Sequence, residues 1–329
     1  MTQLIRGLYA CVGRSQSAYI VQKSKNCCRF WPLRLTTILP REVVHALDKV
    51  AQNLVSVGFN SFGETSLTKA ATHLIKSRGK LLRPTLVLLG SFCAGGVNNL
   101  SLSAATAVEL IHTASLIHDD LIDRDELRRG VPTVHKVFGE EMAVLSGDLL
   151  ISKAIELSAP CGELAIRELA KAAIDMSEGE ARDFEVQRSK KKIGVEEYLE
   201  IVRLKTASLI GSSAAIGGIV SGAEAKLASS LREYGFNLGV AFQIRDDYLN
   251  VLGLNLDKPK STGDDLLRGR PNIVSALTTE YDFETSLKIS RDLNRMYVMR
   301  AQEEAANIGH CSGILTGYSR LVLIDADSL

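Results

Sequence analysis

The stretch that decides the fold is ELIHTASLIHDDLIDRDELRRG, residues 109–130. Its apolar residues recur every three or four positions, which predicts a helix that Gly130 is expected to end. Asp119 and Asp123 are four residues apart, so their carboxylates project from one face, with Asp120 beside them. Three carboxylates beside an apolar segment repel one another unless a cation lies among them. Oxygen ligands of this kind suit magnesium, which substrate phosphates usually complete, so the stretch predicts an aspartate-bound magnesium site.

A second acidic pair lies far along the chain, in FNLGVAFQIRDDYLN at residues 236–250. Asp246 and Asp247 stand at the polar end of another predicted helix, and Gln243 shares a face with Asp246. Two helices that present carboxylates to one cleft can hold several metal ions and a highly charged ligand such as a diphosphate. An ordinary charged helix end would explain DDxxD alone equally well, but the RRG that begins five residues after Asp123 argues against it, and the second pair strengthens the case.

The segments HDDLIDRDELRRG and FQIRDDYLN together resemble the corresponding motifs of the trans-isoprenyl diphosphate synthases, also called polyprenyl synthetases. The resemblance covers roughly residues 42–290 and is strongest to archaeal-type geranylgeranyl diphosphate synthases. It implies an all-α fold, a large single-domain helical bundle of the isoprenoid synthase type, with a central cleft between two aspartate-bearing helices. It also implies a Mg²⁺-dependent prenyltransferase that joins isopentenyl diphosphate head to tail to an allylic diphosphate.

The resemblance assigns roles to single residues. It implies that Asp119, Asp123 and Asp246 bind the metal ions and act in catalysis together with Asp120 and Lys205. The pocket for isopentenyl diphosphate would consist of Lys80, Arg83, His112 and Arg129. The pocket for the allylic diphosphate would consist of Arg128, Lys205, Thr206, Gln243 and Lys260. An arginine grips phosphate oxygens in bidentate fashion, whereas a lysine acts as a point charge.

Two positions depart from the family pattern. Asn250 replaces the usual third aspartate of the second motif, which affects one contact around the metal site and not the site itself. Arg270-Pro271-Asn272 stands where Lys-x-Thr is commoner. His118 adjoins the aspartates but points off their stripe, so we expect it to be structural.

Residues one turn below the first aspartates are expected to set the product length. Ala114 and Ser115 lie one helical turn before Asp119, and Ile111 lies on the next turn. In the family, bulky aromatic residues at this level stop chain growth early. Ala114 and Ser115 are both small, so we predict a product longer than farnesyl diphosphate, most simply geranylgeranyl diphosphate.

Three other interpretations compete with this one. A long-chain polyprenyl diphosphate synthase for a quinone side chain is the closest rival, because Ala114 is small and the N-terminus resembles a transit peptide. A non-catalytic subunit of a heteromeric synthase would have lost aspartates, whereas the first motif is complete here. Class I terpene cyclases also use DDxxD and magnesium, but they lack the pocket that Lys80 and Arg83 would form.

The amino-acid composition further limits the classes of protein to which the chain could belong. Of 329 residues, 46% are hydrophobic and only 5% aromatic, which fits a large helical bundle. A net charge of +1 argues against a basic face that would bind a nucleic acid. The sequence has no run of about 18 apolar residues, so we predict no transmembrane segment. The six cysteines form no CxxC or paired framework, which predicts reduced thiols. The resemblance implies a homodimer, and we expect it in the cytoplasm.

Residues 1–41 differ from the rest of the chain, with seven Lys or Arg and no Asp or Glu. This composition is typical of a mitochondrial transit peptide, although a disordered basic arm or a start assigned too early would show it equally. We expect residues 1–41 to be disordered or cleaved and residues 42–329 to form the synthase domain. The tail from residue 310 resembles the family poorly and receives no assignment.

Overall fold

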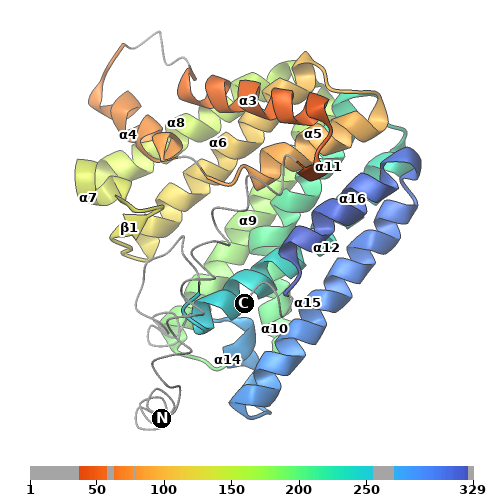
Figure 1. The fold of residues 1–329 in the computed structure, drawn as a ribbon. Helices are drawn as coiled ribbons and strands as arrows, with labels where there is room; N and C mark the ends of the chain where they lie inside the picture. The colour runs from red at the N-terminus through yellow and green to blue at the C-terminus, as the bar shows by residue number, and fades with distance from the viewer. Residues whose placement is uncertain (1–36, 58–62, 78, 255–269, 325–329) are drawn as a thin grey trace.

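The structure is a computed structural model that describes residues 37–57, 63–77, 79–254 and 270–324. Within these ranges the chain is almost entirely helical, which confirms the predicted all-α bundle (Figure 1). The elements are α3 (Arg41–Val55), α4 (Ser66–Lys76), α5 (Leu82–Ala94), α6 (Asn99–Ile122), β1 (Leu127–Arg128), β2 (Val131–Pro132), α7 (Val134–Phe138), α8 (Glu140–Ser158), η1 (Ala159–Cys161), α9 (Glu163–Ser189), α10 (Val195–Val202), η2 (Arg203–Ala207), α11 (Ser208–Val220), α12 (Ala225–Val251), α14 (Ile273–Leu277), α15 (Phe283–Ala306), η3 (Gly309–Cys311), α16 (Ser312–Ser319) and η4 (Arg320–Val322).

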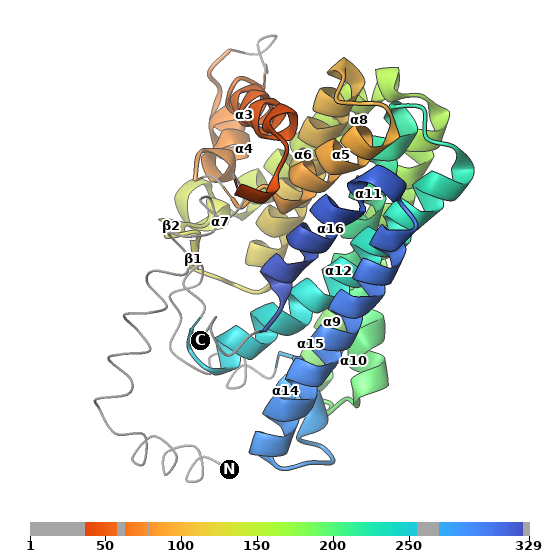
Figure 2. The same ribbon diagram turned by 45° about the vertical axis from the view of Figure 1, so that its right-hand side comes forward.

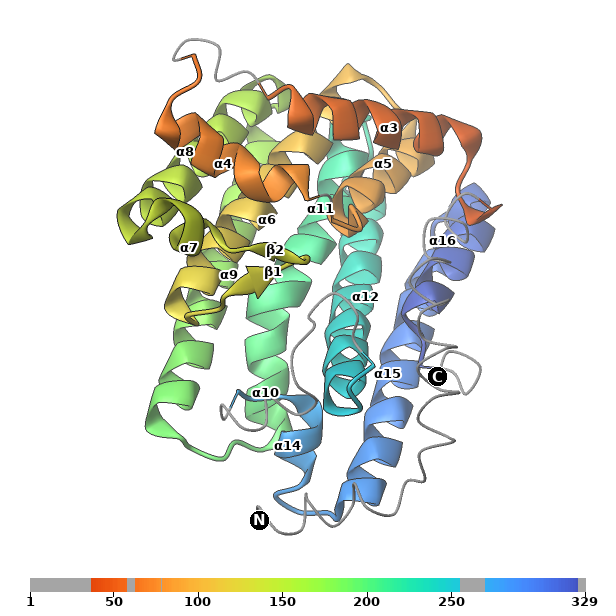
Figure 3. The ribbon, with the colours of Figure 1, turned by 60° about the vertical axis from the view of Figure 1, so that its left-hand side comes forward.

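The centre of the bundle is α11, SLIGSSAAIGGIV, in which every residue except Ile219 is buried. A helix that is apolar or small on all sides belongs in a core. It packs against α5, α9 and α12, and α15 covers α12 on the outside (Figure 2). The approach of α5 requires Gly217, where a Cβ atom would lie 1.9 Å from the carbonyl oxygen of Val87. In Figure 3, α3 lies across one end of this bundle, where it contacts α5 and α6.

The helix that carries the first aspartates differs from the prediction at both ends. It begins ten residues earlier, at Asn99, where the side chain of Asn98 caps it by accepting a hydrogen bond from the backbone of Ser101. It ends at Ile122, so the expected end at Gly130 was wrong. The chain then reverses, with Arg124 in a left-handed conformation, and Arg128 comes back to bind Asp120 in the last helical turn. Arg128 and Arg129 therefore lie on a short antiparallel hairpin, β1–β2, and not on the helix.

One described helix, α6, is long and apolar enough to cross a membrane by length and composition alone. In the bundle, 67% of its apolar window is buried, as in the core helix of a globular protein. No other helix within the described residues meets the same criterion. The expected absence of a transmembrane segment stays a prediction.

Cys93 and Cys311 form a disulfide, so the expectation of reduced thiols was wrong for this pair. They are 218 residues apart in sequence, and only the fold brings the end of α5 to within 5.7 Å of η3, measured between the Cα atoms. Cys161 is a buried free thiol. The other three cysteines lie outside the described residues. Beyond the disulfide, the unassigned tail forms α16 and η4, which pack on α15 and α12.

Reduction of this disulfide should lower the free energy of unfolding by about 2–4 kcal/mol, because the cross-link restricts the unfolded chain. Denaturation by urea, followed by circular dichroism with and without reductant, measures the difference. A variant with Cys93→Ala and Cys311→Ala should behave identically in both buffers. The prediction fails if the oxidised protein is no more stable than this variant.

Candidate active site

Two arginines and a histidine meet around the buried carboxylate of Glu109 on α6. Arg83 comes from the first turn of α5, Arg129 from the β1–β2 turn, and His112 from α6 itself. Nη2 of Arg129 lies 4.0 Å from Oε1 of Glu109. Burial lowers the pKa of Arg83 to about 10, while the charge of Glu109 opposes the shift. Burial and the charge of Arg83 lower the pKa of His112 well below its usual range, so its imidazole is neutral at physiological pH. We call these four residues the arginine pocket.

Two buried atoms of the arginine pocket have no hydrogen-bond partner among the described residues, Nε of Arg83 and Nδ1 of His112. Buried polar groups in native proteins are almost always paired, so these two unpaired atoms mark the arginine pocket as a candidate binding site. Gly79 leaves the space that Arg129 fills, since a Cβ there would lie 2.5 Å from its Nη2. Lys80 follows, partly buried, just before α5. The structure thus places three of the four predicted residues together and the fourth beside Gly79.

Lys205 lies on η2, a π-helical turn between α10 and α11. Its Nζ is 2.6 Å from a carboxylate oxygen of Glu180 and 2.6 Å from one of Asp183, both on α9. We call these three residues the lysine cluster. Gly179 allows the contact, because a Cβ there would lie 2.4 Å from the backbone nitrogen of Lys205. Turns of the π type frequently occur at functional sites.

The charges around Lys205 show that the first acidic motif faces the lysine cluster. Burial alone would lower the pKa of Lys205, but the charges of Asp119, Asp183 and Glu180 raise it, so the ammonium stays protonated. Burial, followed by the charge of Asp119, raises the pKa of Glu180 to about 8. The charge of Lys205 opposes this shift, and Oε1 of Glu180 is buried without a hydrogen-bond partner in the described part of the chain.

The three aspartates of the first motif have different surroundings. Asp120 is 1% exposed and accepts hydrogen bonds from Arg128, one of them from Nε at 2.7 Å. Burial raises the pKa of Asp120 to about 6. Asp123 forms an ion pair of 2.9 Å with Arg270. The carboxylate of Asp119 forms no hydrogen bond or ion pair within the described residues and is open to a ligand, whereas Asp120 and Arg128 bind each other.

Asp247, in the second motif, is the centre of a hydrogen-bond network that the sequence did not reveal. Its carboxylate accepts bonds from Tyr198 at 2.6 Å, from Gln243 at 2.8 Å and from the backbone of Ile273 at 3.2 Å. Burial raises the pKa of Asp247 to about 7. Gln243 also accepts a bond of 3.0 Å from Thr206, so these two predicted ligands of the allylic diphosphate contact each other.

A short segment joins the two acidic motifs. Ile273 binds Asp247, and Arg270, three residues earlier, pairs with Asp123 at 2.9 Å and with Asp125 at 3.0 Å. The backbone from Arg270 to Ile273 spans at most about 10 Å, to which the length of the Arg270 side chain adds, so one short segment contacts both motifs. Within the described residues, no three His, Cys, Asp or Glu side chains are close enough to hold a metal ion as they stand. The donor set nevertheless suits a hard cation, because the carboxylate of Asp119 faces this space without a bound partner.

The remaining predicted residues have the following positions. Ala114 and Ile111 are buried in α6, and the hydroxyl of Ser115 donates to the backbone carbonyl of His112 at 2.9 Å. His118 packs over Gly147 on α8, away from the aspartates, as a structural residue would. Lys260 lies outside the described residues, and Asp246 is partly buried on α12.

The sequence did not predict the contacts of seven residues that hold the predicted ones in place: Glu109, Asp125, Glu180, Asp183, Tyr198, Asp247 and Arg270. Asp247 and Arg270 stood out in the sequence, but their partners did not. The spacing in GEARDFE was the one usable signal, because it puts Glu180 and Asp183 on one helix face. The other five contact residues that are distant in sequence or lie on another element, and no local pattern predicts such pairs.

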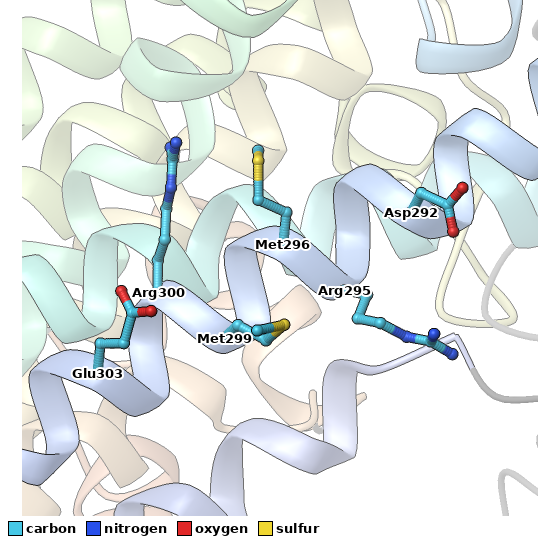
Figure 4. A pocket seen from close by; sticks show the side chains of 6 residues that line it. All are labelled: Asp292, Arg295, Met296, Met299, Arg300 and Glu303. Atoms are coloured by element: carbon cyan, nitrogen blue, oxygen red, sulfur yellow. The ribbon is translucent and has the colours of Figure 1, made fainter.

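A separate hollow of about 310 Å³ lies on α15 (Figure 4). All six residues that line it belong to this helix, and they include Met296, Met299, Arg295 and Glu303. It contains no residue from α6, α9 or α12, so it is not part of the acidic site.

Comparison with known proteins agrees with this geometry. The family described as Polyprenyl synthetase matches residues 64–311. A geranylgeranyl diphosphate synthase from Saccharolobus solfataricus is 37% identical over 75% of each chain, and a geranylfarnesyl diphosphate synthase from Aeropyrum pernix is 41% identical over 66% of this chain and 71% of its own. The crystal structure of a geranylgeranyl pyrophosphate synthetase from Pyrococcus horikoshii superimposes with a TM-score of 0.77 at 28% identity, covering 90% of this chain and 99% of that one. The chain therefore belongs to the polyprenyl synthetase family and is a prenyltransferase.

Proposed function

We propose that this prenyltransferase makes geranylgeranyl diphosphate by adding isopentenyl diphosphate to an allylic diphosphate in the presence of Mg²⁺. The observation that carries most weight is the arrangement along α6. His112 and Asp119 are seven residues, or about 10 Å, apart on this helix. His112 belongs to the arginine pocket, and the charge of Asp119 acts on Lys205 in the lysine cluster. Two adjacent charged sites on one helix suit two diphosphate substrates.

Each site has a distinct task in the proposed reaction. The arginine pocket would bind the diphosphate of isopentenyl diphosphate, with Nε of Arg83 and Nδ1 of His112 as its unpaired polar atoms. The lysine cluster would place Lys205 beside the allylic diphosphate, where its positive charge stabilises the leaving group as the carbon–oxygen bond breaks. The double bond of isopentenyl diphosphate then attacks the allylic cation, and the released diphosphate is positioned to take up the proton.

Metal dependence is general among prenyl synthases, and we infer that the ion is Mg²⁺. Asp119, Asp123 and Asp246 would hold it, since carboxylate oxygens are hard ligands of the kind that Mg²⁺ prefers. When bound, the ion supplies further positive charge to the leaving diphosphate. The role of Lys260 in the same task stays a prediction.

One assay tests the proposal directly. Purified protein is incubated with Mg²⁺, isopentenyl diphosphate and labelled farnesyl diphosphate, and the products are sized by chromatography. A C20 product is expected. Products far longer than C20 would favour the long-chain polyprenyl synthase, and no product from any allylic primer would favour the non-catalytic subunit.

Ala114→Phe should shorten the product to farnesyl diphosphate, because a benzyl side chain one turn below Asp119 would block the growing chain. Ala114 is fully buried, so the larger side chain also costs about 1–3 kcal/mol of stability if no channel accepts it. Product sizing and thermal melting separate these effects. Ala105→Phe, at a buried position two turns farther from the aspartates, is the matched control. If Ala114→Phe is stable and its product is unchanged, another residue limits the chain.

We also propose a homodimer that forms through α8 and α9. Ile155, Leu164 and Ile174 on these helices are each at least 60% exposed, and exposed apolar side chains of this size often mark an interface. Light scattering should give twice the chain mass of 35.7 kDa. Leu164→Asp should shift the protein toward the monomer, and a monomeric wild-type protein would contradict the proposal.

We infer a cytoplasmic location from the archaeal relatives, with the mitochondrion as the alternative that the basic residues 1–41 suggest. Residues 1–41 fused to a fluorescent protein distinguish the two in a eukaryotic cell. Import into mitochondria would contradict the cytoplasmic location.

A further inference from the structure

Arg270 brings a positive charge directly onto the first acidic motif. Its Nη2 lies 2.9 Å from Oδ2 of Asp123 and 3.0 Å from Oδ1 of Asp125. The side chains of Arg270 and Asp123 are each 11% exposed, and that of Asp125 is 1% exposed. Ion pairs this well shielded from water are only weakly screened by salt. The pairs therefore compete effectively with any other cation near Asp123.

Hydrogen bonds of the residues that follow Arg270 hold its backbone in place. Asn272 caps α14 by accepting a hydrogen bond of 2.9 Å from the backbone of Ser275. The backbone of the next residue, Ile273, donates to Asp247 on α12. Arg270 thus extends toward α6 from a segment that is anchored at the second acidic motif.

Asp125 gives Arg270 a second partner. This carboxylate is also 3.7 Å from Arg128, and because it is buried it needs a positive charge nearby. Arg270 can release Asp123 and keep its contact with Asp125, so loss of one ion pair does not leave its guanidinium unpaired. The structure therefore contains a cation that can leave Asp123 at limited cost.

We propose that Arg270 is a built-in counter-ion of Asp123 that competes with the divalent metal ion for this carboxylate. The inference rests on the proposed role of Asp119 and Asp123 as metal ligands. Arg270 raises the metal concentration at which Asp123 is occupied, because the ion must displace a guanidinium that already contacts Oδ2. Metal bound at Asp123 in turn releases Arg270 from this carboxylate, and the contact of Arg270 with Asp125 remains.

The test measures metal binding and not activity. Mn²⁺ serves as the probe, since free Mn²⁺ is quantified by electron paramagnetic resonance in the presence of the full-length protein without substrate. Arg270→Gln should bind Mn²⁺ at least about tenfold more tightly than the wild type, the effect of one adjacent opposite charge on a carboxylate. Arg270→Lys, which keeps the charge, should stay within a few-fold of the wild type.

Arg124→Gln is the matched control, because it removes one positive charge next to Asp123 in sequence. The Arg124 side chain is 66% exposed and pairs with Glu140, so its loss should change the Mn²⁺ affinity by no more than about twofold. A double-mutant cycle with Asp123→Asn isolates the pair. In that background, Arg270→Gln should give no gain.

Thermal melting shows whether each variant is folded. If Arg270→Gln is not folded, the Mn²⁺ affinity of Arg270→Lys is the remaining measurement. The inference is overturned if folded Arg270→Gln binds Mn²⁺ no more tightly than the wild type, including the case in which neither binds it. It is also overturned if Arg124→Gln gains as much, or if the gain persists with Asp123→Asn. The proposed function fails separately, by the absence of product when wild-type protein receives both substrates and Mg²⁺.

Discussion

Asp119→Asn should lower kcat by about 10²–10³-fold, the cost of removing one preorganised group that stabilises charge in a transition state. Asp119 is the residue of the first motif whose carboxylate has no bound partner in the described part of the chain. Its charge nevertheless raises the pKa of both Lys205 and Glu180. The substitution preserves shape and breaks no hydrogen bond, so the melting temperature should stay close to that of the wild type. Initial rates at saturating substrates and Mg²⁺ measure the effect.

Asp148→Asn on α8 provides the control for this substitution. Asp148 is an exposed aspartate on α8, outside the two acidic motifs. Removing its charge should change kcat by less than about twofold, since exposed charges interact weakly. A kcat for Asp119→Asn within threefold of the wild type would exclude Asp119 as a metal ligand, and the proposed metal site would need other residues.

The fold followed from the sequence because its strongest signals are local. Apolar residues at helical spacing predicted helices at both acidic motifs, and these are α6 and α12. The end of α6 could not be predicted, because it depends on Arg128 binding Asp120 across eight residues. Helical spacing continues past Ile122, and the sequence does not show that Arg124 adopts a left-handed conformation and that Arg128 folds back onto Asp120.

The sequence predicted the residues that are proposed to bind metal and substrate, but not the residues that hold them in place. The acidic motifs and the basic residues are recognisable as short motifs in the sequence. The roles of Glu109 and Tyr198, and the hydrogen bonds of Asp247, are not recognisable, because each depends on a partner on another element. The disulfide between Cys93 and Cys311 shows the same limit, since its spacing resembles no known framework.

Gly179→Ala should lower kcat by about 10²-fold, although the residue contacts no proposed substrate. In the middle of a helix such as α9, this change ordinarily stabilises a protein by about 0.5–1 kcal/mol. Here the new Cβ would lie 2.4 Å from the backbone nitrogen and 2.8 Å from the Cα atom of Lys205. Backbone atoms cannot rotate away, so α9 and η2 must separate at a cost of about 1–3 kcal/mol. A displacement of about 1 Å at a catalytic group can cost 10²-fold in rate.

Gly313→Ala on α16 separates this local effect from the general effect of the substitution. Gly313 also lies in a helix, and a Cβ there meets no atom within 4 Å. It should leave kcat unchanged and keep or slightly raise the stability. If Gly179→Ala behaves in the same way, η2 can shift without disturbing Lys205, and the close approach of α9 does not position this lysine. If kcat falls while the melting temperature is kept, the position of Lys205 itself limits the reaction.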